Sequence, residues 1–365
     1  MDQPVYAEAV YVDGLTSNKA TSPNISPRVP VAVSVSNEAA TFEFLNNNNW
    51  PRGLQQYILK NANKMAYRYF ILDDSGSMAT NDGKRLIKLN GPTNYKTVSC
   101  SRWTELGESM KFHSTLASVL NVSCEFRMLN SMAPVTIGGP GGQPEGLGIV
   151  HSVLNDSPGG GTPLCRHISE VINKVRENES ELRRTGQKAC IIIATDGESS
   201  DGDLAKAMAP LQHLPVWVVI KLCTDDTRVV EYWNAIDEKL EIDIDVLDDM
   251  SGESSEVYNV NPWLNYCEPI HRMREFGVPL REMDLLDERL LSADQARQVI
   301  SILYDISLTE LPHPEADFEG LVRRIEALNR DYGKYYSLHY KRMLPLIDIA
   351  SFRKCYGPPS SCIVS

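Results

Sequence analysis

The sequence predicts an α/β protein with a doubly wound, mainly parallel sheet flanked by helices and a C-terminal helical extension. Short apolar runs alternate with amphipathic stretches across residues 50–258, which is typical of strands joined by helices. Two of the runs, residues 67–72 and 189–194, are almost continuously apolar, as in strands covered on both faces. Beyond residue 258 we expect only helices.

Length and charge limit the classes of function. The 365 residues suffice for a sizeable core plus a smaller unit, and the formal net charge of −12 without a long basic run argues against a nucleic-acid partner. We find neither a signal-peptide pattern nor a bilayer-length apolar run, so we expect a cytoplasmic protein. The eight cysteines form no C-x-x-C pair, which favours reduced thiols over a zinc site or a disulfide framework.

The first part of the chain is predicted to contain little regular structure. Residues 1–45 are rich in Ser, Thr, Pro and Asn, and we expect them to be disordered. Residues 50–65 place apolar side chains on one helical face and lead into the strand at 67–72. A loop is expected between that strand and residue 102.

From residue 102 the alternation of helices and strands becomes regular. Helices are predicted at 102–120, 145–154, 164–181, 203–211 and 228–239, and strands at 124–129, 134–137, 189–194, 216–222 and 242–247.

Two glycine-rich stretches invite different interpretations. Residues 138–142 lack the Lys and Ser/Thr of a phosphate loop, so we interpret them as a flexible turn. Residues 158–161 open directly onto a long amphipathic helix, and their glycines allow a tight turn that presents the hydroxyl of Thr162 at the helix entrance.

The C-terminal region divides into residues 259–352, a helical extension, and residues 353–365, a flexible tail. Ser292 and Gln295 have the spacing of a capping box at the start of a helix. A further helix is expected from His313, with an apolar stripe that we attribute to packing rather than to a partner groove.

Oxygen-bearing side chains follow the two most apolar strands. Asp73, Ser75 and Ser77 come after the first strand, and Asp196 comes after the second. In open α/β sheets, ligands bind outside the carboxyl ends of the strands, so these residues and Thr162 are expected to meet in one pocket. Such hard oxygen ligands favour Mg²⁺, with Mn²⁺ or Ca²⁺ able to substitute.

These five residues carry a resemblance to a known family. Asp73-x-Ser75-x-Ser77, the distant Thr162 and Asp196 are similar to the metal-ion-dependent adhesion site of von Willebrand factor A (VWA) domains, over roughly residues 66–250. The resemblance implies that Ser75, Ser77 and sometimes Thr162 coordinate the ion directly, whereas the two Asp carboxylates act largely through water. It also implies an open coordination position for a Glu or Asp of a partner protein. We therefore expect a metal-dependent adaptor or scaffold and not an enzyme.

Several alternatives stand beside this interpretation. The Asp-Ser-Ser segment is also compatible with a simple strand-ending turn. A calcium loop starting at Asp196 is excluded, because its sixth residue is Asp201 and its twelfth is Ala207; Glu198, Asp201 and Asp203 are instead expected to form an acidic rim. The alternative functions are a VWA subunit of an ATP-driven, chelatase-type complex and a Mg²⁺-dependent hydrolase, although no general base is visible for the hydrolase.

The C-terminal residues suggest a lipid anchor. Cys362 begins a four-residue prenylation box, and Cys355 is a possible palmitoylation site. One prenyl chain gives marginal membrane residence, so we expect only reversible, peripheral membrane association. The basic residues nearby are interpreted mainly as a solvated face. These are Lys341, Arg342, Arg353 and Lys354.

Overall fold

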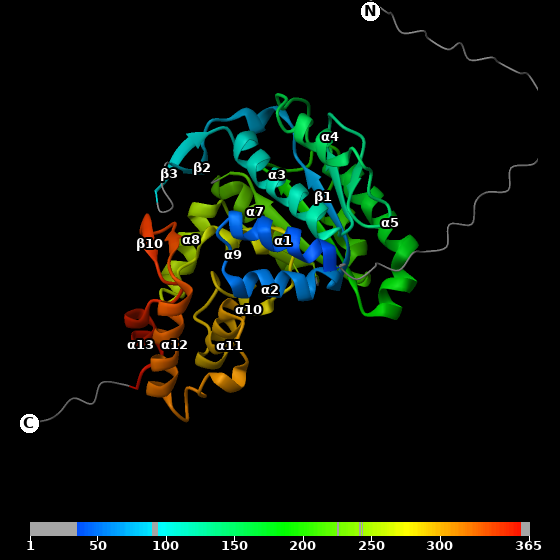
Figure 1. Ribbon diagram of the computed structural model, residues 1–365. Coiled ribbons are helices and arrows are strands. Elements are labelled where there is room, and N and C mark those ends of the chain that lie inside the picture. Colours follow the sequence, from blue (N-terminus) through cyan, green and yellow to red (C-terminus); the bar gives the residue numbers. More distant parts are fainter. Residues whose placement is uncertain (1–34, 90–93, 225, 241, 243, 359–365) are drawn as a thin grey trace, which may run out of the picture.

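The computed structural model describes residues 35–358, except for 90–93, 225, 241 and 243. A six-stranded sheet lies at its centre, in the order β5-β4-β1-β6-β7-β8 (Figure 1). All neighbouring strands are parallel apart from the antiparallel pair of β4 and the edge strand β5. The predicted fold class is therefore confirmed. The strands are β1 (Met65–Leu72), β4 (Cys124–Met128), β5 (Val135–Ile137), β6 (Lys188–Thr195), β7 (Val216–Leu222) and β8 (Ile244–Leu247).

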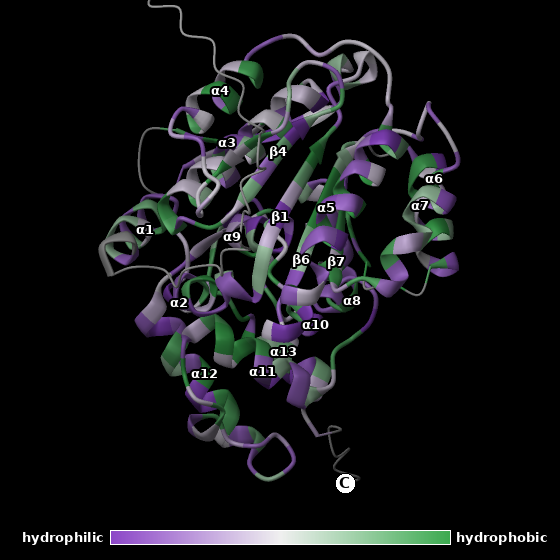
Figure 2. Ribbon diagram, turned by 90° about the vertical axis from the view of Figure 1, so that its right-hand side faces the viewer, coloured by the Kyte–Doolittle hydropathy of each residue, from purple (hydrophilic) through white to green (hydrophobic). Residues whose placement is uncertain are grey.

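Helices cover both faces of this sheet. Side chains alternate along β1, so Phe70 and Leu72 belong to the core on one face, whereas Tyr69 and Ile71 belong to the core on the other. The middle strands are mostly green in Figure 2, as expected for strands buried on both sides. The core that contains Ile71 is closed by α5 (Leu164–Thr185), α6 (Leu204–Met208) and α7 (Thr227–Lys239). The core that contains Phe70 is closed by α1 (Val35–Asn47), α2 (Arg52–Asn61), α3 (Arg102–Leu120), α4 (Gly146–Val153) and C-terminal helices.

The C-terminal helices belong to the same core as the sheet. Phe276 follows α9 (Glu268–Glu275), and its ring lies 6.3 Å from that of Phe70 on β1. Its carbonyl oxygen accepts a 2.9 Å hydrogen bond from Nε of the buried Arg68. The extension therefore closes one face of the sheet. Its other helices are α10 (Arg281–Asp284), α11 (Ala293–Tyr304), α12 (Phe318–Tyr332) and α13 (Ile349–Tyr356), and α8 (Met250–Val260) leads into it from β8.

A buried charge cluster connects α9 to the sheet. The carboxylate of Glu275 lies 2.5 Å from Nζ of Lys221 on β7 and 2.9 Å from Nη1 of Arg272. It also accepts a hydrogen bond from Ser109 and contacts Nε2 of His113, both on α3. Burial by itself would raise the pKa of Glu275, but Lys221 and Arg272 outweigh it and hold the pKa well below its usual range. The cluster thus joins a strand and two helices through one ionised carboxylate.

Two segments differ from the predictions for the N-terminal part. Residues 35–45 were expected to be disordered but form most of α1, because Leu45 is fully buried and Phe44 packs against Phe112. The expected loop before residue 102 contains a hairpin of β2 (Gly83–Lys88) and β3 (Tyr95–Cys100). Its side chains are mostly polar and at least partly exposed, so no apolar run marked these strands. Residues 1–34 of the predicted disordered segment lie outside the described residues.

The extension also departs from an all-helical arrangement. A short hairpin, β9 (Tyr335–Ser337) and β10 (Arg342–Leu344), follows α12. The predicted capping box at Ser292 and Gln295 is confirmed at the start of α11. The next helix begins at Phe318 rather than near His313, because the side chain of Asp317 caps it. The expected flexible tail is helical up to Tyr356 in α13.

Two further features concern the cysteine side chains and the hydrophobic length of the helices. Each of the seven cysteines in the described part of the chain is a free thiol, and Cys124, Cys190 and Cys267 are buried. Among the helices that the structure describes, none combines the length and apolar character that crossing a bilayer requires.

Candidate metal centre

The two strand ends that carry Asp73 and Asp196 are neighbours. In the parallel pair of β1 and β6, Leu72 is opposite Ala194, and the backbone N–H of Asp73 donates to the carbonyl of Ala194 at 2.9 Å. The chain leaves β1 toward β4 on one side and later returns to β6 on the other side. The sequence order therefore reverses here, at the position where α/β sheets bind ligands.

The turn after β1 brings three predicted ligands together. Oδ1 of Asp73 accepts a 2.9 Å hydrogen bond from the N–H of Ser75, which starts a short 3₁₀ turn over Gly76–Ala79. The hydroxyl oxygens of Ser75 and Ser77 lie 3.0 Å apart. The Ser77 hydroxyl in turn donates to Oδ1 of Asp196 at 2.8 Å. Hydrogen bonds thus join four of the five predicted ligands in one chain of contacts.

Thr162 is the fifth predicted ligand. Hydrogen bonds of its backbone hold it next to Ser200 in the loop after β6. Oγ of Ser200 accepts from the N–H of Thr162 at 3.1 Å, and the N–H of Ser200 donates to the Thr162 carbonyl at 2.9 Å. The preceding glycines contact the turn after β1, since Gly76 donates to the Gly160 carbonyl at 3.2 Å. Three separate loops therefore meet at this edge of the sheet.

Asp74, which was not predicted as a functional residue, holds the glycine-rich loop and the loop after β4 in place. Its carboxylate accepts hydrogen bonds from the backbone and side-chain amides of Asn130 and from the N–H of Ser131, each at 2.9 Å. Gly160 has φ +98° and lies so near Asn130 that an added Cβ would be 2.6 Å from its Oδ1. A glycine is therefore required at this position. Asp73 contacts the predicted ligand Ser75, whereas the adjacent Asp74 holds the loop after β4. Their spacing in the sequence could not reveal this difference.

The two aspartates of the site are stabilised differently. Asp73 is held by hydrogen bonds, and Asp196 is paired with a cation. Asp73 is fully buried, and burial raises its pKa, while hydrogen bonds from Ser75 and from Oγ1 of Thr195 oppose the rise. Arg102, at the start of α3, donates from Nη1 to Oδ2 of Asp196 at 2.8 Å and also pairs with Asp82. The negative charge of Asp196 is thus already balanced by a cation. Sequence spacing gave no sign of this pairing.

The expected acidic rim is partly used for helix capping. Asp201 accepts hydrogen bonds from the N–H groups of Cys165 and Arg166 in the first turn of α5. Asp203 accepts from the N–H of Lys206 at the start of α6. Both carboxylates remain exposed, as does Glu198. The rim therefore exists, but two of its acids are explained by the helix ends.

The spacing of the oxygen atoms suits a small divalent ion. Adjacent ligands of an octahedral Mg²⁺ ion, with metal–oxygen distances of about 2.0–2.1 Å, lie about 2.9 Å from one another. The contacts from Ser75 to Ser77 and from Ser77 to Asp196 measure 3.0 and 2.8 Å. The donors are hydroxyl and carboxylate oxygens, without thiolate or imidazole. The residues present therefore fit the ion that the sequence predicts.

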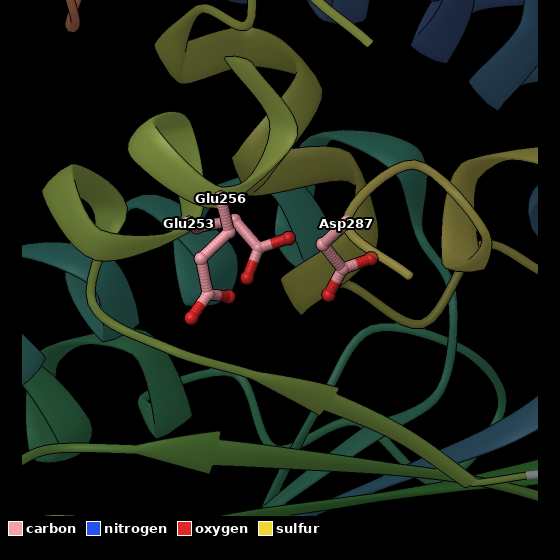
Figure 3. Close-up of side chains that lie close together, drawn as sticks. All are labelled: Glu253, Glu256 and Asp287. Atoms are coloured by element: carbon pink, nitrogen blue, oxygen red, sulfur yellow. The ribbon is translucent and has the colours of Figure 1, made fainter. Parts of the chain in front are cut away.

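A second group of carboxylates lies between α8 and the extension. Glu253 and Glu256 project from α8 toward Asp287 (Figure 3), and their oxygen atoms lie within 4.8 Å of one another. Arg274 forms an ion pair with Glu253 and lies 3.6 Å from Asp287. Burial raises the pKa of Glu253 to about 8, although Arg274 opposes the rise. Arg274 therefore offsets part of the negative charge of this cluster.

Of the two predicted lipidation sites, only Cys355 lies within the described residues. Cys362 lies outside the described residues. Cys355 lies in the last turn of α13, where it is partly buried and packs against the core. Of the basic residues nearby, Arg353 pairs with Glu319 at 2.6 Å.

We compared the chain with protein-family models and with curated proteins. No protein-family model matches the chain, and a search of curated proteins finds no match.

Proposed function

We propose that this chain is a metal-dependent protein-binding module of the VWA type. The observation that carries the proposal is the chain of oxygen contacts from Ser75 through Ser77 to Asp196, at the carboxyl ends of adjacent parallel strands. In this proposal Ser75 and Ser77 hold Mg²⁺ directly, Thr162 lies at its rim, and Asp73 and Asp196 act mainly through water. Mn²⁺ or Ca²⁺ would substitute at the same oxygen ligands.

The proposed partner is a protein that supplies a Glu or Asp carboxylate. Neutral hydroxyl ligands leave most of the charge of the ion uncompensated, so the ion would attract an external anionic oxygen. The exposure of Ser77 supports access from solvent. Binding through a bridging ion requires no bond to be broken, so the proposed role is that of an adaptor or scaffold.

Metal binding is tested first, by isothermal titration calorimetry with MgCl₂. The wild-type chain is expected to bind Mg²⁺, and Ser75→Ala/Ser77→Ala is expected to lose binding. Ser99→Ala, an exposed serine on β3, serves as the control and is expected to bind as the wild type does. A double variant that binds Mg²⁺ with wild-type affinity would contradict the assigned ligands.

Partner recognition is tested by a pull-down from lysate with the same variants. We expect one set of proteins to be recovered in Mg²⁺, lost on adding a chelator, and absent with the double variant. Equal recovery in every arm would refute recognition through the metal while leaving the calorimetric result intact.

We further propose that the C-terminus tethers this module reversibly to a cytoplasmic membrane surface through prenylated Cys362. The partly buried position of Cys355 makes it a poor second anchor, so a single lipid would give weak residence. Cys362→Ser is expected to move the protein from the membrane pellet to the supernatant, whereas Cys100→Ser leaves the distribution unchanged. An unchanged pellet fraction for Cys362→Ser would exclude the tether.

A further inference from the structure

A cavity of about 280 Å³ lies between α8 and the C-terminal extension, and none of its lining residues belongs to the candidate metal centre. It is formed by α8, the segment at 262–266, α12, the β9 and β10 hairpin and the start of α13. Its volume is close to the lower end of the range for small-molecule sites, about 300–1,000 Å³. Apolar side chains form much of its wall. These include Leu264, Leu344, Pro345 and Ile347.

Asn265 lines this cavity, and the oxygen of its buried side-chain amide lacks a hydrogen-bond partner within the described chain. Asn265 is only 6% exposed, and its Nδ2 donates to the carbonyls of Tyr335 and Leu344 at 3.3 and 3.2 Å. Because both of these partners are acceptors, the orientation of the amide is fixed and the remaining atom, Oδ1, must be the acceptor. This Oδ1 is buried and has no hydrogen-bond partner within the described chain. A buried acceptor of this kind needs an N–H or O–H donor, which a water molecule or a ligand can supply.

Aromatic side chains and a carboxylate surround the same cavity. The rings of Tyr258 and His339 stack with centroids 3.8 Å apart, and the Tyr340 hydroxyl donates to that of Tyr258 at 2.9 Å. Tyr340 remains 44% exposed, so this aromatic group faces solvent. Asp348 is the one carboxylate among the described lining residues, which include neither Lys nor Arg. The lining therefore favours flat, neutral or cationic molecules over anions.

We propose that this cavity binds a small, flat, neutral or singly cationic molecule through an N–H donor to Oδ1 of Asn265. The ring of the ligand packs between the apolar wall and the aromatic group of Tyr258, His339 and Tyr340. Asp348 attracts a positive charge on the ligand and repels a negative one. The site is independent of the proposed metal-dependent function, because the two share no residue.

Four related probes separate the parts of this proposal. Tryptamine offers a ring, an N–H donor and a positive charge; indole lacks the charge; 1-methylindole also lacks the donor; indole-3-acetate replaces the cation with an anion. Binding to the full chain is measured by ligand-observed NMR titration. We expect tryptamine to bind most tightly, indole to bind about tenfold more tightly than 1-methylindole because of the added hydrogen bond, and indole-3-acetate to bind most weakly.

Two variants with one control locate the binding. Ala350 is an exposed lining residue at the start of α13, so Ala350→Trp is designed to place a large ring at the cavity and is expected to weaken tryptamine binding at least about tenfold. Lys354→Trp adds the same side chain on the same helix outside the cavity and is expected to leave binding unchanged. Tyr340→Ala removes the exposed ring without filling the core, and it serves as a second test if Ala350→Trp fails to fold.

The proposal is overturned by any of three results. The first is an absence of saturable binding for both tryptamine and indole. The second is tryptamine binding that survives unchanged in folded Ala350→Trp or, where that variant does not fold, in Tyr340→Ala. The third is equal affinity for indole and 1-methylindole, which would remove the role of Asn265.

Discussion

Nη1 of Arg102 lies 2.8 Å from Oδ2 of Asp196, on the opposite side of the carboxylate from the Ser77 hydroxyl. The side chain of Asp196 is only 1% exposed, so the pair is shielded from solvent. The Arg102 guanidinium is also held by two bonds to Asp82, and the hydrogen bond with Asp82 raises the pKa of Arg102. A permanent positive charge therefore stands beside the proposed Mg²⁺ position.

Arg102→Ala is expected to strengthen Mg²⁺ binding about three- to tenfold, because it removes like-charge repulsion and frees one oxygen of Asp196. Arg102→Lys, which keeps the charge but loses the fixed fork of donors, should give an intermediate affinity. Calorimetric titration measures both variants. Arg85→Ala is the control, since Arg85 pairs with Glu108 outside the site. Unchanged or weaker binding by Arg102→Ala would show that the guanidinium does not compete with the ion.

Thr195→Val is expected to destabilise the fold by about 1.5–3 kcal/mol. The substitution keeps the shape but removes the 2.7 Å hydrogen bond to Oδ2 of the fully buried Asp73. Urea denaturation measures the loss. Thr97→Val, an exposed position on β3, should change the stability by less than about 0.5 kcal/mol. Equal stabilities of the two variants would mean that Asp73 does not depend on this donor.

Glu275→Gln is expected to cost about 3–5 kcal/mol, because it leaves Lys221 and Arg272 buried without their shared counter-charge. Chemical denaturation gives the free energy of unfolding. The matched control is Glu108→Gln, which removes a half-exposed ion pair with Arg85 and should cost less than about 1 kcal/mol. A small effect at Glu275 would argue that the cluster tolerates a neutral centre.

Asp284 gives the protein a defined dependence of stability on pH. Burial, with the neighbouring Asp245, raises the pKa of Asp284 from 3.8 to about 9. Because the unfolded chain releases this proton at a lower pH, the contribution of Asp284 to stability is greatest below about pH 4 and is lost as pH rises toward 9.

Asp284→Asn removes this titration while keeping a donor for Asp245. The variant should therefore gain stability relative to wild type progressively as the pH rises between the two pKa values, because only the wild type must release this proton or keep it at a cost. At pH 4 the two proteins should be nearly equal. Denaturation curves at pH 4, 6 and 8 check the trend, and a constant difference across that range would contradict it.

The elements that could be predicted are those whose pattern is local. Helix α3 was predicted at 102–120, as observed, because its apolar residues recur at helical spacing and Ser101 caps it. Strands β1 and β6 were visible as apolar runs that end at Asp73 and near Asp196. The convergence of these acids follows from strand adjacency, which the predicted α/β topology already implied.

The features that sequence reasoning missed depend on contacts between distant residues. Helix α1 is stabilised by burial of Leu45, and the polar hairpin of β2 and β3 lacks the apolar alternation of a half-buried strand. Arg102 and Asp196 are 94 residues apart, so no motif spacing connects them. The unpartnered oxygen of Asn265 likewise results from a hairpin at Tyr335 and Leu344 that the sequence did not reveal.

The bond between Arg68 and Phe276 has a consequence for biosynthesis. These residues are separated by 208 positions, so at about 5–20 residues per second the ribosome needs about 10–40 s to deliver the partner of a strand already made. During that delay the part of the Phe70 surface that Phe276 covers stays exposed, although His113 and Phe126 already pack against the same ring. We therefore expect this face of the sheet to complete its packing only after α9 has been synthesised.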